Sequence, residues 1–145
     1  MDIYAAHIRD DGKIQSVKDH LEGTAKLASN FAVCFGGDEH AYLCGLLHDA
    51  GKYSEKFQRR IHEGCNMVDH STAGTQFIKN NLPTIGFLLA YCIAGHHGGL
   101  PDGGSRADTC DDPTLNGRIQ KKIEVYSTFE QEVDIEPYLP KCPIQ

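Results

Sequence analysis

The sequence lacks any apolar run long enough to cross a membrane as a helix. Its most apolar segment, IGFLLAYCIAG at residues 85–95, is too short for the roughly 20 residues that a bilayer requires. The N-terminus, MDIYAAHIRD, also lacks a basic segment followed by an apolar one, so it shows no secretory signal. These absences predict a cytoplasmic protein that has no membrane partner.

Cysteine pairs of the C-x-x-C type are also missing. The six cysteines are scattered, and Cys34, Cys44 and Cys92 lie in apolar helical stretches, where a free thiol behaves as a small apolar side chain. We therefore expect reduced cysteines and no disulfide scaffold. The net charge of −6 at pH 7 excludes a protein that coats nucleic acid by electrostatics alone, but it leaves room for a nucleic-acid enzyme with a local basic patch.

Strand-like alternation and internal repeats are absent, except for a possible extended start near Ile3 and Tyr4. Apolar residues recur at helical spacing instead, and the 145 residues suffice for one hydrophobic core. The sequence predicts one all-α domain with a loop over residues 98–113 and an irregular tail. The first expected helix begins after Ser16 and ends at Gly36. Further helices are expected over residues 38–50, 54–64, 69–82, 83–97 and 112–133.

In the first helix, the expected buried stripe includes Phe31 and Phe35 near its end. Ser16 and Asp19 resemble a capping box at its start, and Ser54 is expected to cap the third helix.

Polar residues interrupt the apolar pattern at GLLHDAGK. Asp49 falls at the expected C-terminal end of a helix, where the macrodipole disfavours an anion, and a buried carboxylate there needs a cation. A metal ion would supply that charge, and Lys52 is a weaker candidate. His48 and Asp49 together offer one nitrogen and up to two oxygens, and such a carboxylate can bridge two metals.

Four further histidines fall on or beside other expected helices. His20 lies on the apolar stripe of the first helix, and His70 stands at the start of the fourth. Each could by itself be a core or capping residue. The adjacent His96 and His97 end the fifth helix, and two neighbouring imidazoles rarely share a buried site without a metal or an acid.

The full set predicts a metal site, because five inward histidines and a carboxylate in one helical core are otherwise costly to bury. Mixed imidazole and carboxylate donors suit Fe, Mn, Co, Ni or Zn better than Ca or Mg alone. His40 and His62 lie among charges and are expected to face solvent, and His7 stays unassigned.

Four stretches resemble a known family: YAAHIRDDGKIQSVKDHLEGTAKLA, GLLHDAGKYSEKFQ, DHSTAG and AGHHGGLPD. They are similar to the HD nuclease domain of the CRISPR-associated helicase-nuclease of type I systems, within the HD superfamily of metal-dependent phosphohydrolases. The resemblance covers about residues 3–102. It implies an HD-domain helical bundle. It also implies a cytoplasmic endonuclease of antiviral defence that degrades single-stranded DNA with divalent metals. Its partners would be a helicase region or subunit and the CRISPR surveillance complex.

The resemblance also implies roles for individual residues. One metal would be held by His20, His48 and Asp49. The other would be held by Asp49 as a bridge together with His70, His96 and His97. Asp49 and Lys52 would be the catalytic residues, with Lys52 approaching the scissile phosphate. The metals would be Mn, Fe, Co or Ni, in up to two positions, with Mg as a further candidate.

The chain departs from this family in two respects. The family's first metal has a further aspartate ligand on a later helix, and its HD domain usually precedes a helicase region, whereas no G-x-x-x-x-G-K-[ST] motif occurs here. We therefore expect residues 1–145 to be an HD nuclease domain that lacks its C-terminal helices and any helicase region.

Two other functions remain open at this point. One is an HD phosphohydrolase acting on nucleotides or cyclic dinucleotides. The other is a truncated metal-binding module without activity. A nuclease would also need a path for its strand, and the basic side chains of Lys52, Lys56, Arg59 and Arg60 are either such a path or a solvated helix face.

Overall fold

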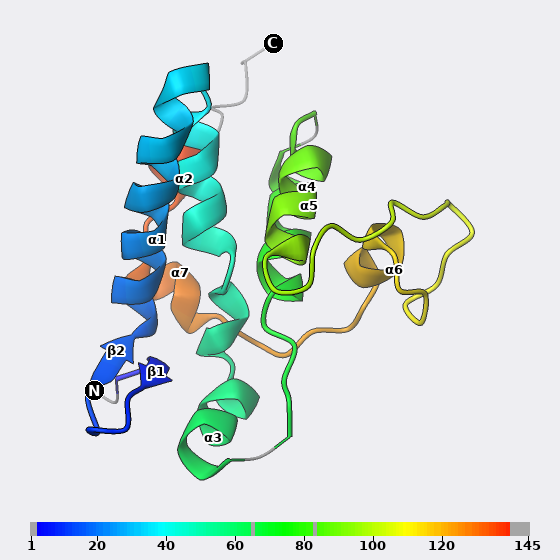
Figure 1. Ribbon diagram of the computed structural model, residues 1–145. Helices are drawn as coiled ribbons and strands as arrows, with labels where there is room; N and C mark the ends of the chain where they lie inside the picture. The colour runs from blue at the N-terminus through cyan, green and yellow to red at the C-terminus, as the bar shows by residue number, and fades with distance from the viewer. Residues whose placement is uncertain (1–2, 65, 83, 140–145) are drawn as a thin grey trace.

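The structure is a computed structural model that describes residues 3–64, 66–82 and 84–139. Two pairs of helices form its body (Figure 1). Helix α1 (Val17–Ala32) packs along α2 (Asp38–Leu47), and α4 (Thr72–Asn81) packs along α5 (Gly86–Gly95). The predicted all-α class is confirmed, since the only sheet among the described residues is one small hairpin. The apolar core includes Leu21, Leu43, Leu47, Ile78, Ala90, Ile93, Leu115 and Phe129.

Both predicted N-caps are confirmed. The Ser16 hydroxyl accepts a hydrogen bond from the Asp19 backbone N–H at 3.0 Å and donates to the Asp19 carboxylate at 2.7 Å. The Ser54 hydroxyl caps α3 (Glu55–Glu63) by accepting from the Phe57 N–H at 3.3 Å. These short-range bonds depend only on neighbours in sequence, which is why the sequence pattern located them.

The N-terminal segment differs from the sequence prediction. Strands β1 (Ala5–Ile8) and β2 (Ile14–Ser16) form an antiparallel hairpin, whereas only an extended start near residues 3 and 4 was expected. The cause lies far away in the chain: the Gln58 amide accepts from the Ala5 N–H at 2.9 Å and donates to the Ala5 carbonyl at 3.0 Å. A contact across 53 residues leaves no local pattern.

The second helix ends earlier than predicted. Helix α2 stops at Leu47, and a tight 3-10 turn, η2 (Ala50–Tyr53), follows it. The Gly51 N–H bonds the His70 carbonyl at 3.1 Å, so it does not continue the helix. His48 and Asp49 therefore lie at a break between two helical segments, where their side chains can turn inward.

The single predicted helix over residues 112–133 is wrong. The chain forms two short helices, α6 (Leu115–Ile119) and α7 (Thr128–Glu132), followed by η3 (Glu136–Tyr138). Near the end of α6, the Gln76 amide donates to the carbonyls of Arg118 and Lys121, at 3.4 and 2.7 Å. Leu115 and Phe129 are both fully buried, so each short helix has its own anchor in the core.

Two phenylalanines expected in the core are exposed. Phe31 and Phe35 are 77% and 76% exposed, although the periodicity placed them on the buried stripe. The buried face of α1 follows residues 17, 21, 25 and 32 instead. Phe31 precedes Ala32 by one residue and so lies about 100° away from that face. A short 3-10 turn, η1 (Val33–Phe35), then ends the segment at Gly36, which has a φ of 71°.

Three remaining sequence predictions concern ends and cysteines. The predicted start of the fifth helix at Pro83 lies outside the described residues, and α5 begins at Gly86. The four described cysteines, Cys34, Cys44, Cys92 and Cys110, are free, which agrees with the expected reduced thiols for these four. Within residues 3–64, 66–82 and 84–139, no helix combines the length and the apolar character needed to cross a membrane.

The contact between α4 and the end of α2 gives a test of the fold. A Cβ at Gly74 would collide with the Leu47 carbonyl oxygen, so Gly74→Ala should lower the free energy of unfolding by about 1–3 kcal/mol. Gly23 lies in α1, where an added Cβ would meet no atom of the surroundings within 4 Å, so Gly23→Ala should raise stability by about 0.5–1 kcal/mol. Urea unfolding of both variants measures the difference, and equal effects would contradict this packing.

Candidate metal centre

A single carboxylate, that of Asp49, forms the middle of the site. Asp49 is 1% exposed, and its Oδ2 atom lies 2.8 Å from His20 Nε2, 3.2 Å from His48 Nε2 and 3.0 Å from Lys52 Nζ. Its Oδ1 atom lies 3.1 Å from His96 Nε2, 3.3 Å from His70 Nε2 and 3.9 Å from His97 Nε2. The structure thus brings together all six residues that the sequence analysis singled out as metal ligands.

These side chains come from separate parts of the fold. His20 projects from α1, and His48 and Asp49 follow α2. His70 precedes α4, and His96 and His97 follow α5. The helix pairs in Figure 1 thus contribute ligands from both halves of the bundle. The arrangement depends on a backbone contact, because the Gly51 N–H bonds the carbonyl of His70 itself.

Three of the imidazole rings are held in orientation by a contact between Nδ1 and a backbone carbonyl. A backbone carbonyl can only accept a hydrogen bond, so each ring nitrogen that contacts one must carry the proton. The Nε2 atom of each of these rings faces Asp49. It donates to the carboxylate when the ring is protonated, and its lone pair is available to a metal when the ring is neutral. The Nδ1 atoms concerned are those of His48, His70 and His96, which lie 2.8, 3.0 and 2.7 Å from the carbonyls of Gly45, Val68 and Ile93.

The electrostatics of the site favour an ionised carboxylate. Burial alone would raise the pKa of Asp49, but hydrogen bonds from His20, His48 and His96 outweigh it and hold the pKa far below its usual range. Burial also lowers the pKa of His70, which favours the neutral form of that ring, the form that binds a metal. Burial alone would lower the pKa of His96 too, but its bonds to Asp49 and to the Ile93 carbonyl outweigh this effect and raise the pKa.

The donor atoms fit two divalent metal positions that share Asp49. One group consists of Asp49, His70, His96 and His97, and the other of His20, His48 and Asp49, with the donor atoms in each group within 4.8 Å of one another. Ring nitrogens come close together there: His70 Nε2 and His97 Nε2 lie 2.8 Å apart, within hydrogen-bond distance. Imidazole and carboxylate donors without a thiolate suit first-row transition metals. The chemistry of the residues therefore fits the expected divalent ions.

Lys52 is part of this centre. The residue is 4% exposed, and its ammonium group lies 3.0 Å from Asp49 Oδ2, on the oxygen that also contacts His20 and His48. It lies 3.4 Å from the Ala6 carbonyl and 3.3 Å from His7 Nε2. Lys52 is therefore a buried counter-ion of Asp49 on the side of the three-residue group.

His7, which has no assigned role from the sequence, lies at the edge of the centre. Its ring centroid lies 4.9 Å from that of His20. Burial and the nearby Lys52 lower the pKa of His7. The hairpin brings His7 there, and Gln58 holds the hairpin against α3, so two residues that no local pattern marked as functional shape this side of the site.

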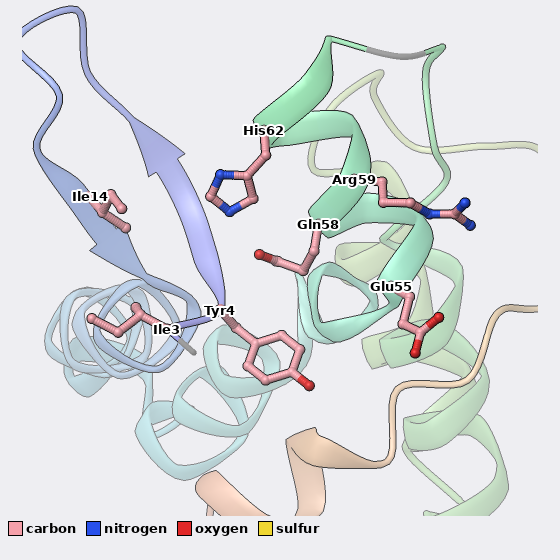
Figure 2. Close-up of a pocket in the computed structure, with 7 residues that line it drawn as sticks. All are labelled: Ile3, Tyr4, Ile14, Glu55, Gln58, Arg59 and His62. Carbon is pink, nitrogen blue, oxygen red and sulfur yellow. The ribbon is translucent and has the colours of Figure 1, made fainter. Parts of the chain in front are cut away.

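The basic side chains that were considered as a strand path do not gather into one patch. Lys52 points inward, Lys56 pairs with Glu124 at 3.3 Å, and Arg60 lies 5.7 Å from the Phe57 ring centroid. Arg59 lines a separate hollow of about 730 Å³ between α3 and the hairpin. Figure 2 shows Gln58 and His62 turned toward the hairpin there, with the Arg59 guanidinium pointing away from it. The four cations therefore do not form one path for a strand.

A different hollow borders the metal centre. It measures about 510 Å³, and both His70 and His97 line it, together with the loop after α5 and Arg118 of α6. The His97 side chain is 62% exposed, whereas less than a fifth of each of the other four imidazoles is accessible. The centre is thus open to solvent on its His97 side. Arg118 is a residue that the sequence analysis missed.

The two ligand groups should differ in affinity. We expect Mn²⁺ to fill the four-residue group first, because the other group has three ligands and the Lys52 ammonium beside it. Calorimetric titration should show two steps, with His97→Ala weakening the tighter one and His20→Ala the weaker one, each by about tenfold or more. Lys52→Met should strengthen the weaker step, because it removes a competing positive charge.

The exposed His40 of α2 provides the control, and His40→Ala should change neither step. A protein that takes up no Mn, Co, Ni or Zn would contradict the metal site. Loss of the tighter step in His20→Ala would contradict the predicted order.

In a comparison with protein families, residues 17–128 match the HD domain. No curated protein matches the chain. The matched residues contain all five imidazoles and the shared carboxylate of the candidate metal centre. HD domains are generally metal-dependent hydrolases, which agrees with the donor set found here. The match spans more than half of the chain, and the protein therefore belongs to the HD domain family.

Proposed function

We propose that this chain is the HD nuclease domain of a type I CRISPR-associated helicase-nuclease and that it hydrolyses phosphodiester bonds in single-stranded DNA. The observation that carries the proposal is the sharing of Asp49 by two groups of metal-binding residues. Two divalent ions placed side by side are a common means of phosphodiester hydrolysis. The four sequence stretches that resemble this nuclease supply every one of these ligands.

The residues of the centre would have different roles in phosphodiester hydrolysis. Divalent ions bound here would activate a water molecule and offset the charge that develops on the phosphate. Asp49 would hold both ion positions in register, and the backbone carbonyls behind His48, His70 and His96 would keep the rings oriented. Lys52 borders the three-residue group, where its ammonium could approach a non-bridging oxygen of the scissile phosphate.

The exposure of the centre favours a strand over a small nucleotide. A phosphohydrolase acting on nucleotides or cyclic dinucleotides would need a closed pocket with groups that recognise the base. His97 is 62% exposed here, and the adjoining hollow runs along the surface past residues 98–101. A polymer could lie across such an opening with its phosphate over the metal positions.

The proposal also includes the expected partners. A helicase region or subunit would supply the single strand, and the CRISPR surveillance complex would direct the protein to its target. The basic residues of α3 offer little that would bind a duplex by charge alone, since they are dispersed or paired. Delivery of the strand by another component agrees with this dispersal.

A nuclease assay tests the proposal. With Mn²⁺ or Co²⁺ in excess the chain should cleave a labelled single-stranded oligonucleotide, weakly at low metal and better at high metal, because mass action fills the weaker position. Asp49→Ala should lower the rate at least about a thousandfold, since it removes ligands of both ions, each worth several kcal/mol. His40→Ala is the matched control and should cleave normally.

Other outcomes would identify the alternatives. Cleavage of cyclic dinucleotides or nucleotides, with the strand left intact, would replace the nuclease by a small-molecule phosphohydrolase. Metal uptake without hydrolysis of any of these compounds would leave a binding module. Near-native cleavage by Asp49→Ala would remove the shared carboxylate from the mechanism.

A further inference from the structure

Arg118 is the one cation among the described residues that lines the hollow beside His70 and His97. It stands on α6, within the matched HD region but outside the four stretches that resemble the nuclease. Its Nη1 atom donates to the Ser71 hydroxyl at 2.8 Å and to the Ala94 carbonyl at 3.3 Å. Ser71 directly follows the ligand His70, and Ala94 precedes the ligand His96 by two residues, so the guanidinium is fixed next to both ligand segments.

The charge of this guanidinium has no ion-pair partner within the described part of the chain. Asp69 lines the same hollow and attracts the guanidinium electrostatically, but the two make no ion pair within 4.0 Å. Its two carboxylate oxygens are already bound by Thr72, one by the backbone N–H at 3.1 Å and one by the hydroxyl at 2.6 Å. Both side-chain hydrogen bonds of Arg118 use Nη1, so Nε and Nη2 make no bond to a described residue.

A half-buried arginine with free donors beside a metal centre is suited to an anion. The planar guanidinium matches the oxygens of a phosphate and keeps its charge at any physiological pH. Its anchorage by Ser71 and Ala94 reduces the side-chain entropy that binding would otherwise cost. A strand cleaved at the metal positions would carry further phosphates nearby, and the hollow of about 510 Å³ is lined by His70 and His97 as well as by Arg118.

We propose that Arg118 binds a phosphate group of the substrate next to the one that is cleaved, on the His70 and His97 side of the centre. This inference rests on the proposed function and specifies which residue holds the strand. It also gives the substrate a direction, since the neighbouring phosphate would lie toward α6 and away from the Lys52 side.

A purely structural role is the main rival. Arg118 joins the start of α4 to the end of α5, so its loss could simply disturb His70 and His96. Arg118→Gln removes the charge and keeps a donor group, and its Mn²⁺ uptake shows whether the segments of His70 and His96 stay in place. Arg118→Lys makes the converse change, since it keeps the charge and loses the planar fork.

The experiment measures strand binding and metal uptake independently. Fluorescence anisotropy of a short labelled oligothymidine, in chelator so that no cleavage occurs, gives the strand affinity, and calorimetry with Mn²⁺ gives metal uptake. Arg118→Gln should weaken strand binding by about tenfold to a hundredfold, the worth of a charged hydrogen bond, and leave Mn²⁺ uptake unchanged. Arg118→Lys should keep most of the strand affinity.

Two controls define the ligand. Lys26→Gln removes an equal charge from the exposed side of α1 and should leave strand binding unchanged. An oligothymidine with neutral methylphosphonate links should bind the parent protein and Arg118→Gln equally weakly. A labelled cyclic dinucleotide in place of the strand tests whether the phosphate belongs to a small molecule. Weaker binding of this compound to Arg118→Gln than to the parent protein would support the phosphate contact with that substrate.

The outcomes separate this inference from the proposed nuclease. Unchanged strand binding in Arg118→Gln, or a loss that follows a matching loss of Mn²⁺ uptake, would overturn the inference even if the parent protein cleaves DNA. Loss of strand binding with unchanged Mn²⁺ uptake would support the role of Arg118 even if the parent protein cleaves no DNA. In that case only the proposed nuclease function would be contradicted. If Arg118→Gln does not fold, Arg118→Lys decides, because a large loss of affinity with the charge retained would overturn the inference.

Discussion

The burial of one carboxylate governs this structure. An isolated ionised Asp49 would be prohibitively costly at 1% exposure, and it is tolerated because five imidazoles and one ammonium surround its two oxygens. Those groups come from both helix pairs and from the turn after α2. The same interactions that make the carboxylate acceptable therefore fix the bundle around it, so the fold and the candidate centre stabilise each other.

Small residues allow the ligand segments to approach closely enough. A Cβ at Gly51 would lie 2.5 Å from the His70 carbonyl oxygen, and a Cβ at Gly74 would collide with the Leu47 carbonyl. The glycines of HDAGK and DHSTAG thus mark two backbone contacts between the same pair of segments. Their effect reaches the metal centre directly, because each contact joins a ligand-bearing segment to its partner.

The surroundings of the centre are asymmetric, and this shapes its chemistry. On one side the buried Lys52, the hairpin and Gln58 close the three-residue group. On the other side His97 is exposed and a hollow leads to Arg118. One cation thus lies inside the centre and another at its entrance, an arrangement that suits a phosphodiester entering from the His97 side.

Much of the fold and all six candidate ligands follow from the sequence. Capping at Ser16 and Ser54 and the helical class depend on neighbouring residues, so a local pattern reveals them. The ligands could be recognised because charged and imidazole side chains at the ends of apolar helices conflict with burial unless they meet. The sequence reveals that conflict, but it does not reveal the three-dimensional arrangement that resolves it.

Only the tertiary structure decided the features that depend on distant contacts. Phe31 has the right period to be buried but faces solvent, and the helix expected over residues 112–133 divides where Gln76 donates to its carbonyls. Lys52 turned inward to balance Asp49, and Arg118 reached the hollow through Ser71 and Ala94. The hydrogen-bond partners of Gln76 and Arg118 lie 24 or more residues away in the sequence, and the exposure of Phe31 depends on how α1 packs. The direction of Lys52 follows from the break after α2. Local periodicity records which residues prefer burial, whereas the partner that satisfies each polar group is chosen only when the chain closes on itself.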